Sequence, residues 1–164
     1  MIGRRHVLTA SASALAGAAV LSAFGQRSAA LPVGGTFEVT KTAAEWRKAL
    51  TPLQFSILRE QGTEPPFSSP LDKEWHKGVY DCAGCALPVF SSADKFDSGT
   101  GWPSFTRPIR GAVQTSDDHS LGMLRTEVHC RRCGGHLGHV FDDGPKPTGQ
   151  RWCIDGAALV FHRA

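Results

Sequence analysis

The fold of this chain is decided by two short stretches, Cys82-Ala83-Gly84-Cys85 and Cys130-Arg131-Arg132-Cys133. Two Cys-x-x-Cys pairs are the usual way to close a tetrahedral site of four thiolates around zinc. The long insert between them, residues 86 to 129, predicts that the metal joins two distant turns and leaves a β-segment between them. A structural zinc ion of this kind stabilises the fold directly.

Two other uses of these four cysteines stay open at this point, two disulfides or a redox-active dithiol. The spacing favours zinc, because a disulfide across two residues closes a strained loop. The fifth cysteine, Cys153, is then left without a partner. A lone cysteine is often only a small buried hydrophobic residue.

The neighbours of Cys153 favour a reactive thiol instead. Residues 151 to 154 have the pattern of a β-strand, and side chains alternate between the two faces of a strand. Arg151, Cys153 and Asp155 should therefore share one face, with Trp152 and Ile154 on the other. The sequence predicts that Cys153 is a catalytic nucleophile placed between a cation and a carboxyl group.

The first 30 residues predict an export signal. They contain Arg4-Arg5 followed by a weakly apolar run, and they contain no acidic residue. This is typical of a twin-arginine signal. Ser11 and Ser13 make the run too polar for a membrane anchor, and small residues before Ala30 offer a cleavage site. We expect a periplasmic or otherwise exported protein with no stable membrane association after cleavage.

The charge of the remaining chain excludes one class of zinc protein. The whole sequence has 18 basic and 15 acidic residues, and three of the basic ones lie in the first 30 residues. The part after the signal is therefore close to neutral and has no basic face, so nucleic-acid binding is not expected. No heptad pattern or long exposed apolar run is present, and we expect a monomer.

The chain after the signal is long enough for one domain with a real core. Residues 31 to 41 predict a flexible arm and residues 42 to 164 a single catalytic domain. Thr42-Ala43-Ala44-Glu45 is a capping box that opens a short helix through Leu50. Thr51-Pro52-Leu53-Gln54 opens a second helix that should end near Gly62.

The sequence after Lys77 predicts a mainly β fold with antiparallel pairing and helices only on its N-terminal side. Short β-runs alternate there with glycine, proline and aspartate. The expected strands are 79–82, 89–90, 112–115, 123–129, 139–141, 151–154 and 157–161.

Two histidines and one tryptophan are further candidates for the site. His136 and His139 follow the second cysteine pair among several glycines, and either could assist a reactive thiol or pass a proton to a leaving oxygen. Each could also support the zinc site or lie on the surface. Trp102 lies in a tight turn, and its indole face suits a small apolar or sulfur-bearing group.

Several motifs in this order closely resemble the B-type peptide methionine-(R)-sulfoxide reductases over roughly residues 43 to 163. They are Gly62-Thr63-Glu64-Pro65-Pro66-Phe67, Lys95-Phe96-Asp97-Ser98-Gly99, Gly101-Trp102-Pro103-Ser104-Phe105, residues 130 to 141 and Arg151-Trp152-Cys153-Ile154.

The resemblance implies a fold of two antiparallel sheets with peripheral helices, stapled by zinc at the four paired cysteines. It implies that Cys153 attacks the sulfoxide sulfur and that His139 assists protonation of the sulfoxide oxygen. His136 would be a neighbour in the pocket and Trp102 the platform for the methyl group. Arg151 would lie in the substrate-binding region. The substrates would be oxidised proteins, and the cysteine would pass through a sulfenic acid.

The sequence departs from a common family pattern at two positions. Many relatives carry a resolving cysteine where Thr100 stands and an asparagine where Asp155 stands. With the other four thiols assigned to zinc, we expect a thioredoxin-like or small-thiol donor to reduce Cys153 directly. A carboxylate at Asp155 should disfavour the Cys153 thiolate, unless Arg151 offsets it or Asp155 is protonated.

Two functions of other classes fit the same residues. One is an exported, zinc-stabilised binding module without redox chemistry, which would not need Cys153. The other is a thiol redox sensor, in which oxidation of Cys153 is the signal and no substrate is turned over. The neutral charge and the Trp102 and His139 candidates fit a peptide-substrate enzyme better.

Overall fold

The structure is a computed structural model that describes residues 37–164. The predicted signal at residues 1–30 and most of the predicted arm at 31–41 lie outside the described residues. Within the described part, no helix has the length and apolar character needed to cross a membrane.

Two short helices come first, and both begin at the predicted capping boxes. α1 spans Ala43–Ala49 and α2 spans Pro52–Glu60. The side chains of Thr42 and Thr51 accept hydrogen bonds from backbone N–H groups three residues later, and the returning bonds from Glu45 and Gln54 are also present. These local contacts explain why both helix starts could be predicted from sequence alone.

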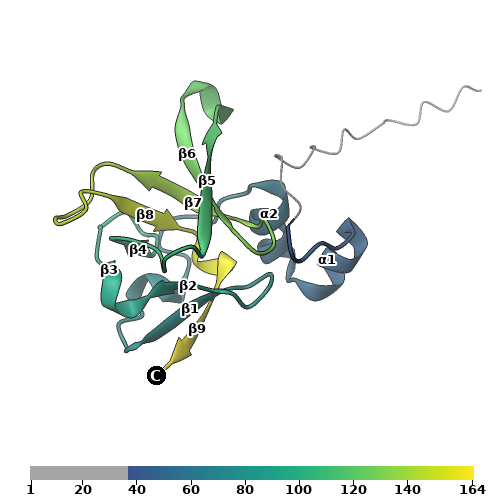
Figure 1. Cartoon of the computed structure of the whole chain (residues 1–164), viewed down its shortest axis with the longest axis horizontal. Helices are drawn as coiled ribbons and strands as arrows, with labels where there is room; N and C mark the ends of the chain where they lie inside the picture. The colour runs from purple at the N-terminus through teal and green to yellow at the C-terminus, as the bar shows by residue number, and fades with distance from the viewer. Residues whose placement is uncertain (1–36) are drawn as a thin grey trace, which may run out of the picture. The chain divides into compact units, whose positions relative to one another are not determined.

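The rest of the domain forms two antiparallel sheets, as the resemblance implied (Figure 1). The three-stranded sheet has the order β2-β1-β9, and the six-stranded sheet has the order β3-β4-β8-β7-β6-β5. The strands are β1 (Gly78–Cys82), β2 (Pro88–Ser91), β3 (Lys95–Phe96), β4 (Ser104–Phe105), β5 (Val113–Asp118), β6 (Arg125–Cys130), β7 (His136–Phe141), β8 (Arg151–Ile154) and β9 (Leu159–Arg163).

An aromatic cluster joins the two sheets in the core. Phe90 on β2 stacks on Phe105 of β4 with ring centroids 4.5 Å apart, and Tyr80 on β1 meets the same ring edge-on at 5.1 Å. All three side chains are fully buried. Because aromatic side chains bury large apolar areas, this cluster stabilises the packing of the two sheets against each other.

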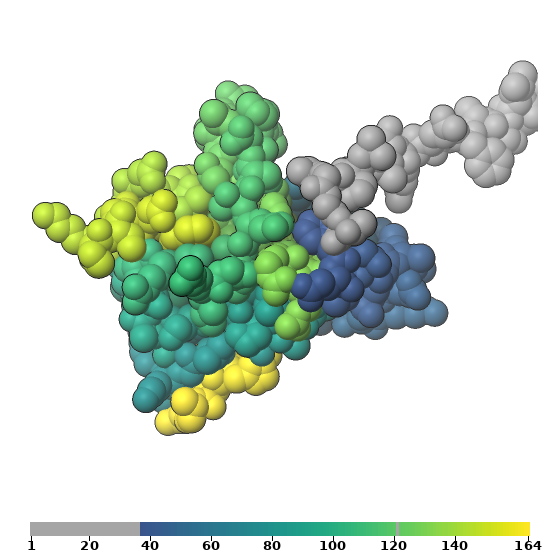
Figure 2. Space-filling view, in the orientation of Figure 1, coloured from purple at the N-terminus to yellow at the C-terminus, as the bar shows by residue number. Residues whose placement is uncertain are grey.

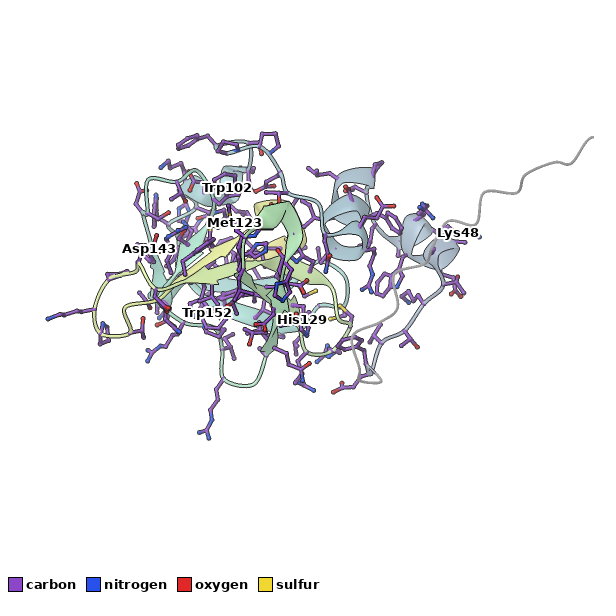
Figure 3. The ribbon with its side chains drawn as sticks, turned by 90° about the horizontal axis from the view of Figure 1, so that it is seen from above. Lys48, Trp102, Met123, His129, Asp143 and Trp152 are labelled. Carbon is purple, nitrogen blue, oxygen red and sulfur yellow. The ribbon has the colours of Figure 1, made fainter. Side chains whose placement is uncertain are left out.

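The helices cover one end of this β-structure. α2 buries Phe55, Ile57 and Leu58, and it contacts β7. Figure 3 shows Lys48 on the helical side, well apart from Trp102 and Trp152 in the β part. The hairpin of β5 and β6 instead projects from the body, as the space-filling view shows (Figure 2).

The strands differ from the sequence prediction in several details. β5 extends to Asp118 and β7 begins at His136, each three residues beyond the predicted strand. β3 and β4 have only two residues each, too few for an alternating pattern, and were not predicted. β6 begins at Arg125, because Met123 and Leu124 belong to the exposed turn of its hairpin. β9 begins at Leu159, because a short 3-10 turn at Gly156–Ala158 precedes it.

The described end of the N-terminal arm contacts the second cysteine turn. The Val39 N–H donates to the carbonyl of Arg132 at 3.0 Å, and Glu38 forms an ion pair with Arg131. Phe37 meets the ring of His129 edge-on. These contacts tie residues 37–39 to the start of the β6–β7 turn.

Candidate active site and metal centre

Four sulfur atoms from two distant turns come together, at the end of one interior strand of each sheet. The Sγ atoms of Cys82, Cys85, Cys130 and Cys133 all lie within 4.8 Å of one another. The closest pairs are Cys82 with Cys133 at 3.7 Å and Cys85 with Cys130 at 3.5 Å. A disulfide would need about 2.05 Å. Four sulfurs at about 2.3 Å from a central zinc lie about 3.8 Å apart, so these residues fit a tetrahedral metal ion.

This metal centre connects the two sheets. Cys82 ends β1 in the three-stranded sheet, and Cys130 ends β6 in the six-stranded sheet. Guanidinium groups hydrogen-bond to backbone carbonyls of both turns. Arg59 donates to the carbonyl of Cys133, and Arg132 donates to the carbonyl of Cys85. The four predicted ligands are therefore brought together across the long insert, in the way their spacing indicated.

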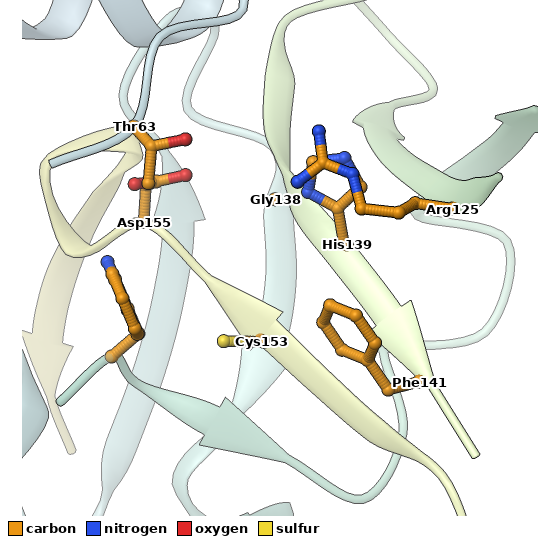
Figure 4. Close-up of a pocket in the computed structure, with 8 residues that line it drawn as sticks. Thr63, Arg125, Gly138, His139, Phe141, Cys153 and Asp155 are labelled. Atoms are coloured by element: carbon orange, nitrogen blue, oxygen red, sulfur yellow. The ribbon is translucent and has the colours of Figure 1, made fainter. Parts of the chain in front are cut away.

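Cys153 lies on β8, in the interior of the six-stranded sheet. Its partner on β4 is Ser104 and its partner on β7 is His139. The strand alternates as predicted, because Trp152 and Ile154 are buried in the core while Cys153 faces the other side. Its sulfur opens into a pocket of about 130 Å³ (Figure 4).

The glycine before His139 allows this close arrangement. Gly138 has a φ of 147°, in the region that favours glycine. A Cβ atom at this position would collide with the carbonyl oxygen of Cys153. The lack of a side chain at Gly138 therefore lets β7 approach β8 and brings His139 beside the thiol.

The pocket holds four of the predicted site residues. Cys153, His139, Trp102 and Asp155 all line it. His136 and Arg151 are not among the described residues that line the pocket. Both nevertheless contact its surroundings, as the following paragraphs show.

The surroundings of Cys153 raise the pKa of its thiol above that of a free cysteine. Burial raises the pKa of Cys153, and the charge of Asp155 acts in the same direction. The charge of Arg151 and hydrogen bonds with Thr100 and Ser104 oppose this, but the pKa remains raised. The Ser98 hydroxyl lies 2.8 Å from those of both Thr100 and Ser104. These three hydroxyl groups thus form a chain that includes Ser104, the cross-strand partner of Cys153.

Arg151 acts on the thiol from a position fixed by other residues. Its guanidinium group donates to both carboxylate oxygens of Asp143, at 2.9 and 2.8 Å, and lies over the ring of Phe141. The hydrogen bond with Asp143, followed by the charge of Cys153, raises the pKa of Arg151. A cation held in this way favours the thiolate without entering the pocket.

His139 is held by the hairpin of β5 and β6. Its Nε2 lies 2.8 Å from a carboxylate oxygen of Asp118, which also accepts from Arg125 at 2.6 Å. Burial lowers the pKa of His139, and the hydrogen bond with Asp118 acts against this effect. The imidazole is therefore a neutral group that an anionic partner orients and can help to charge.

His136 is buried behind the pocket. Its Nδ1 lies 2.7 Å from Glu127, which also accepts a hydrogen bond from Ser116 at 2.8 Å. Burial acts to raise the pKa of Glu127, but the hydrogen bonds with His136 and Ser116 outweigh it and lower this pKa to about 2. The ring of His136 meets that of His139 edge-on, with centroids 5.3 Å apart. His136 thus supports the position of His139.

Trp102 is fixed by a glutamate that the sequence analysis did not single out. The indole N–H donates to the backbone carbonyl of Glu64 at 3.1 Å. The buried Glu64 carboxylate accepts from the N–H groups of Gly156 and Ala157, at 2.6 and 3.0 Å. Glu64 therefore ties the connector after α2 both to the pocket wall and to the turn after β8.

Asp155 is a buried carboxyl group beside the thiol. Burial raises its pKa to about 6, although the N–H of Glu64 donates to Oδ1 at 2.9 Å and acts in the opposite direction. The protonated and ionised forms of Asp155 are thus both populated near pH 6. Asp155 is therefore neutral beside Cys153 below about pH 6, in line with the expectation that it can be protonated.

Four further residues line the pocket and were not singled out by the sequence analysis: Thr63, Arg125, Gly138 and Phe141. Gly138 and Phe141 lie within the quoted motif of residues 130 to 141. Thr63 belongs to a motif already quoted for the family resemblance, so a signal was present. Arg125 and Asp118 are cross-strand partners at the end of the β5–β6 hairpin. A correct hairpin register would have paired them, but their link to His139 depends on the third strand, β7.

Comparisons with known proteins agree with this site. The model of the SelR domain matches residues 50–163. A protein of Agrobacterium fabrum named peptide methionine sulfoxide reductase MsrB is 54% identical over 125 residues, which cover 76% of this chain and 93% of that protein. Proteins with the same name from Leptospira interrogans and Methanosarcina barkeri are 52% and 54% identical. They match 77% and 75% of this chain, and 98% and 87% of their own length.

The matched region contains both cysteine turns, the pocket and all nine strands of the described residues. A family match over most of the chain, with relatives above half identity, settles the family. The chain belongs to the SelR domain family, that of the proteins named peptide methionine sulfoxide reductase MsrB.

Proposed function

We propose that this protein reduces methionine-(R)-sulfoxide in oxidised proteins to methionine, with Cys153 as the nucleophile. The observation that carries the proposal is the meeting of Cys153, His139 and Trp102 in one small pocket of a SelR domain. A sulfoxide needs a soft nucleophile at sulfur and a proton source at oxygen. The choice of the R epimer follows the family, in which one enzyme serves each epimer.

The reaction balances without an outside proton. The Cys153 thiol and the sulfoxide yield methionine and a cysteine sulfenic acid, so the oxygen moves from the substrate to the enzyme. The raised pKa of Cys153 supports a thiol that carries its own proton into the reaction. Arg151 then favours the thiolate as the proton leaves.

His139 is suited to carry this proton to the sulfoxide oxygen. It is the cross-strand neighbour of Cys153, and both side chains face the same pocket. The hydrogen bond with Asp118 stabilises the charged imidazole that forms for a moment during transfer. Trp102 provides an apolar face for the methyl group of the substrate.

An external thiol is proposed to regenerate Cys153. The chain has five cysteines, and the other four form the metal centre. The hydroxyl group of Thr100, where many relatives carry a resolving cysteine, acts to lower the pKa of Cys153. The sulfenic acid therefore reacts with two thiols from a thioredoxin-like or small-molecule donor, which returns the Cys153 thiol and gives water and a donor disulfide.

Zinc is the metal proposed for the four cysteines. Four buried or half-buried thiolates at tetrahedral spacing are the ligand set typical of structural zinc. The ion would hold the two turns together, and the four cysteines would fill all four of its coordination positions. Loading with zinc, measured by metal analysis at one ion per chain, tests this assignment.

Export through the twin-arginine pathway is proposed from Arg4 and Arg5. Cell fractionation of the full chain should place it outside the cytoplasm, with the mature form starting after about Ala30. Lysine at both arginine positions should retain the chain in the cytoplasm. Equal export of this variant would contradict the twin-arginine assignment.

The deciding experiment follows turnover of a peptide that carries each methionine sulfoxide epimer, with dithiothreitol as the reductant. The mature protein should reduce the R epimer, and Cys153→Ser should lose this activity. Thr100→Ser is the matched control, because it keeps the hydroxyl group near the sulfur.

Three outcomes would contradict the proposal in different ways. A lack of turnover with either epimer would favour a binding module or a thiol sensor. Turnover by Cys153→Ser would remove the assigned nucleophile. An intramolecular disulfide of Cys153 after one turnover would overturn the direct use of an external reductant.

A further inference from the structure

Phe67 is an exposed aromatic residue held in an unfavourable backbone conformation. Its side chain is 64% exposed and its φ is 62°. Residues other than glycine and asparagine rarely adopt this left-handed region, because Cβ crowds the backbone. Strain of this kind persists only where the surroundings enforce it, and it gathers at functional sites.

The strain comes from a turn that would normally use glycine here. The N–H of Ser68 donates to the carbonyl of Pro65 at 3.3 Å, so Pro66 and Phe67 are the central residues of a β-turn. Proline at the second position and a positive φ at the third are the arrangement of a type II turn, which favours glycine or asparagine where Phe67 stands. A large apolar side chain at this position contributes nothing to the turn itself.

The turn is fastened to the loop that carries Trp102. The N–H of Phe67 donates to the carbonyl of Gly101 at 2.7 Å. A Cβ atom at Gly101 would lie 2.7 Å from the nitrogen of Phe67 and 2.8 Å from its ring. Phe67 therefore lies directly against Gly101, one residue from the pocket wall at Trp102.

The size of the pocket leaves part of a peptide substrate outside. A cavity of about 130 Å³ holds a group about the size of benzene. One sulfoxide side chain can enter it, but the neighbouring residues of the peptide must lie on the surface. The exposed ring of Phe67 is an apolar surface against Gly101, the residue that precedes Trp102 of the pocket lining.

We propose that Phe67 is a specificity-determining residue that contacts an apolar side chain next to the methionine sulfoxide of an extended peptide. This inference rests on the proposed function and adds a preference to it. Phe67 is a contact outside the pocket, so it affects which peptides bind and leaves the reaction at sulfur unchanged.

The test compares three substrates that all carry methionine-(R)-sulfoxide: a capped amino acid, a peptide with leucine on both sides and a peptide with serine on both sides. Wild type should favour the leucine peptide over the serine peptide about three- to tenfold in kcat/KM. In Phe67→Asn this ratio should approach one through a higher KM for the leucine peptide. Turnover of the capped amino acid should stay within twofold.

Two controls separate this role from a structural one. Asparagine and glycine both accept a positive φ, so Phe67→Asn and Phe67→Gly should have a Tm equal to or above that of wild type. Trp75→Asn removes another exposed aromatic side chain, 51% exposed, whose ring lies 3.6 Å from the Lys95 ammonium group, and it should keep the leucine preference.

The outcomes also separate this inference from the proposed function. An unchanged leucine preference in Phe67→Asn, or an equal loss on all three substrates, would overturn the role of Phe67 while the enzyme remained a reductase. If wild type turned over none of the three substrates, the proposed function and this inference would both fall.

Discussion

At the residue scale, the reactivity of Cys153 is set by opposing charges on the same face of the sheet. Arg151 favours the thiolate, while burial and Asp155 favour the thiol. Asp155 changes its own charge near pH 6. The thiol therefore responds to pH through its neighbour as well as through its own ionisation.

Asp155→Asn should lower the pKa of the Cys153 thiol, because it removes the nearby carboxylate charge. Alkylation by iodoacetamide, followed from pH 6 to pH 10, should show its midpoint at lower pH in the variant. The loss of turnover that accompanies ionisation of Asp155, as pH rises through 6, should also be absent in the variant. Identical alkylation midpoints in the two proteins would mean that Asp155 does not influence the thiol.

The same carboxyl group should reduce stability as pH rises. The pKa of Asp155 is about 6 in the folded protein and about 3.9 in an unfolded chain. Its contribution is fully favourable below about pH 4 and is lost as pH rises through 6, which amounts to about 3 kcal/mol. Urea unfolding should show that Asp155→Asn gains stability over wild type at pH 8 but gains little at pH 4.5. An equal difference at both pH values would contradict this account.

At the element scale, the β6–β7 pair depends on the buried contact of Glu127 with His136. The pKa of Glu127 is about 2 when folded and about 4.3 when unfolded. Its contribution is present above about pH 4 and is lost as pH falls towards 2. Glu127→Gln should therefore cost about 2 kcal/mol at pH 7 and much less at pH 3. A cost that did not change with pH would assign the effect to packing instead.

α2 depends on its N-terminal cap. The Thr51 side chain accepts from the N–H of Gln54 at 3.2 Å, and this bond satisfies one of the free donors of the first turn. Thr51→Ala should cost about 1 kcal/mol in urea unfolding, whereas Thr51→Ser should cost little. Because no residue of α2 lines the pocket, kcat should stay near the wild-type value in both variants.

The helices and strands differ in how far they could be predicted from the sequence. Both helices and the main strands were predicted, since capping boxes and alternation are local signals. β3 and β4 were not, because two residues show no period. The strand that carries Cys153, and the face of the sheet to which its side chain points, were predicted. The contacts of His139 with Asp118 and of Trp102 with Glu64 were not predicted, because they join segments far apart in the chain. Such contacts depend on strand order, which no local pattern encodes.

At the scale of the whole molecule, the metal centre connects the two sheets at one end and the aromatic cluster connects them in the core. Two turns from different sheets supply the four sulfurs, and the described part of the N-terminal arm contacts the second turn. Loss of the metal should therefore weaken the whole domain, since the four thiols would repel one another once ionised.

Chelation should lower the Tm and expose the four metal-binding thiols. Before treatment, a thiol reagent should react with a single cysteine per chain, Cys153. After a strong chelator it should react with all five, and Cys153→Ser should lower both counts by one. Five reactive thiols in the untreated protein would rule out a filled metal centre.

The pairing of β1 with β9 has a consequence for synthesis. Cys82 on β1 is the partner of Leu159 on β9, so the strand that carries the first metal ligand is completed by nearly the last residues of the domain. A nascent chain still lacking residues 159–163 cannot finish this sheet and leaves its cysteine turn without full support. A translation product that ends before Leu159 therefore lacks the backbone partner of Cys82, one of the four candidate metal ligands.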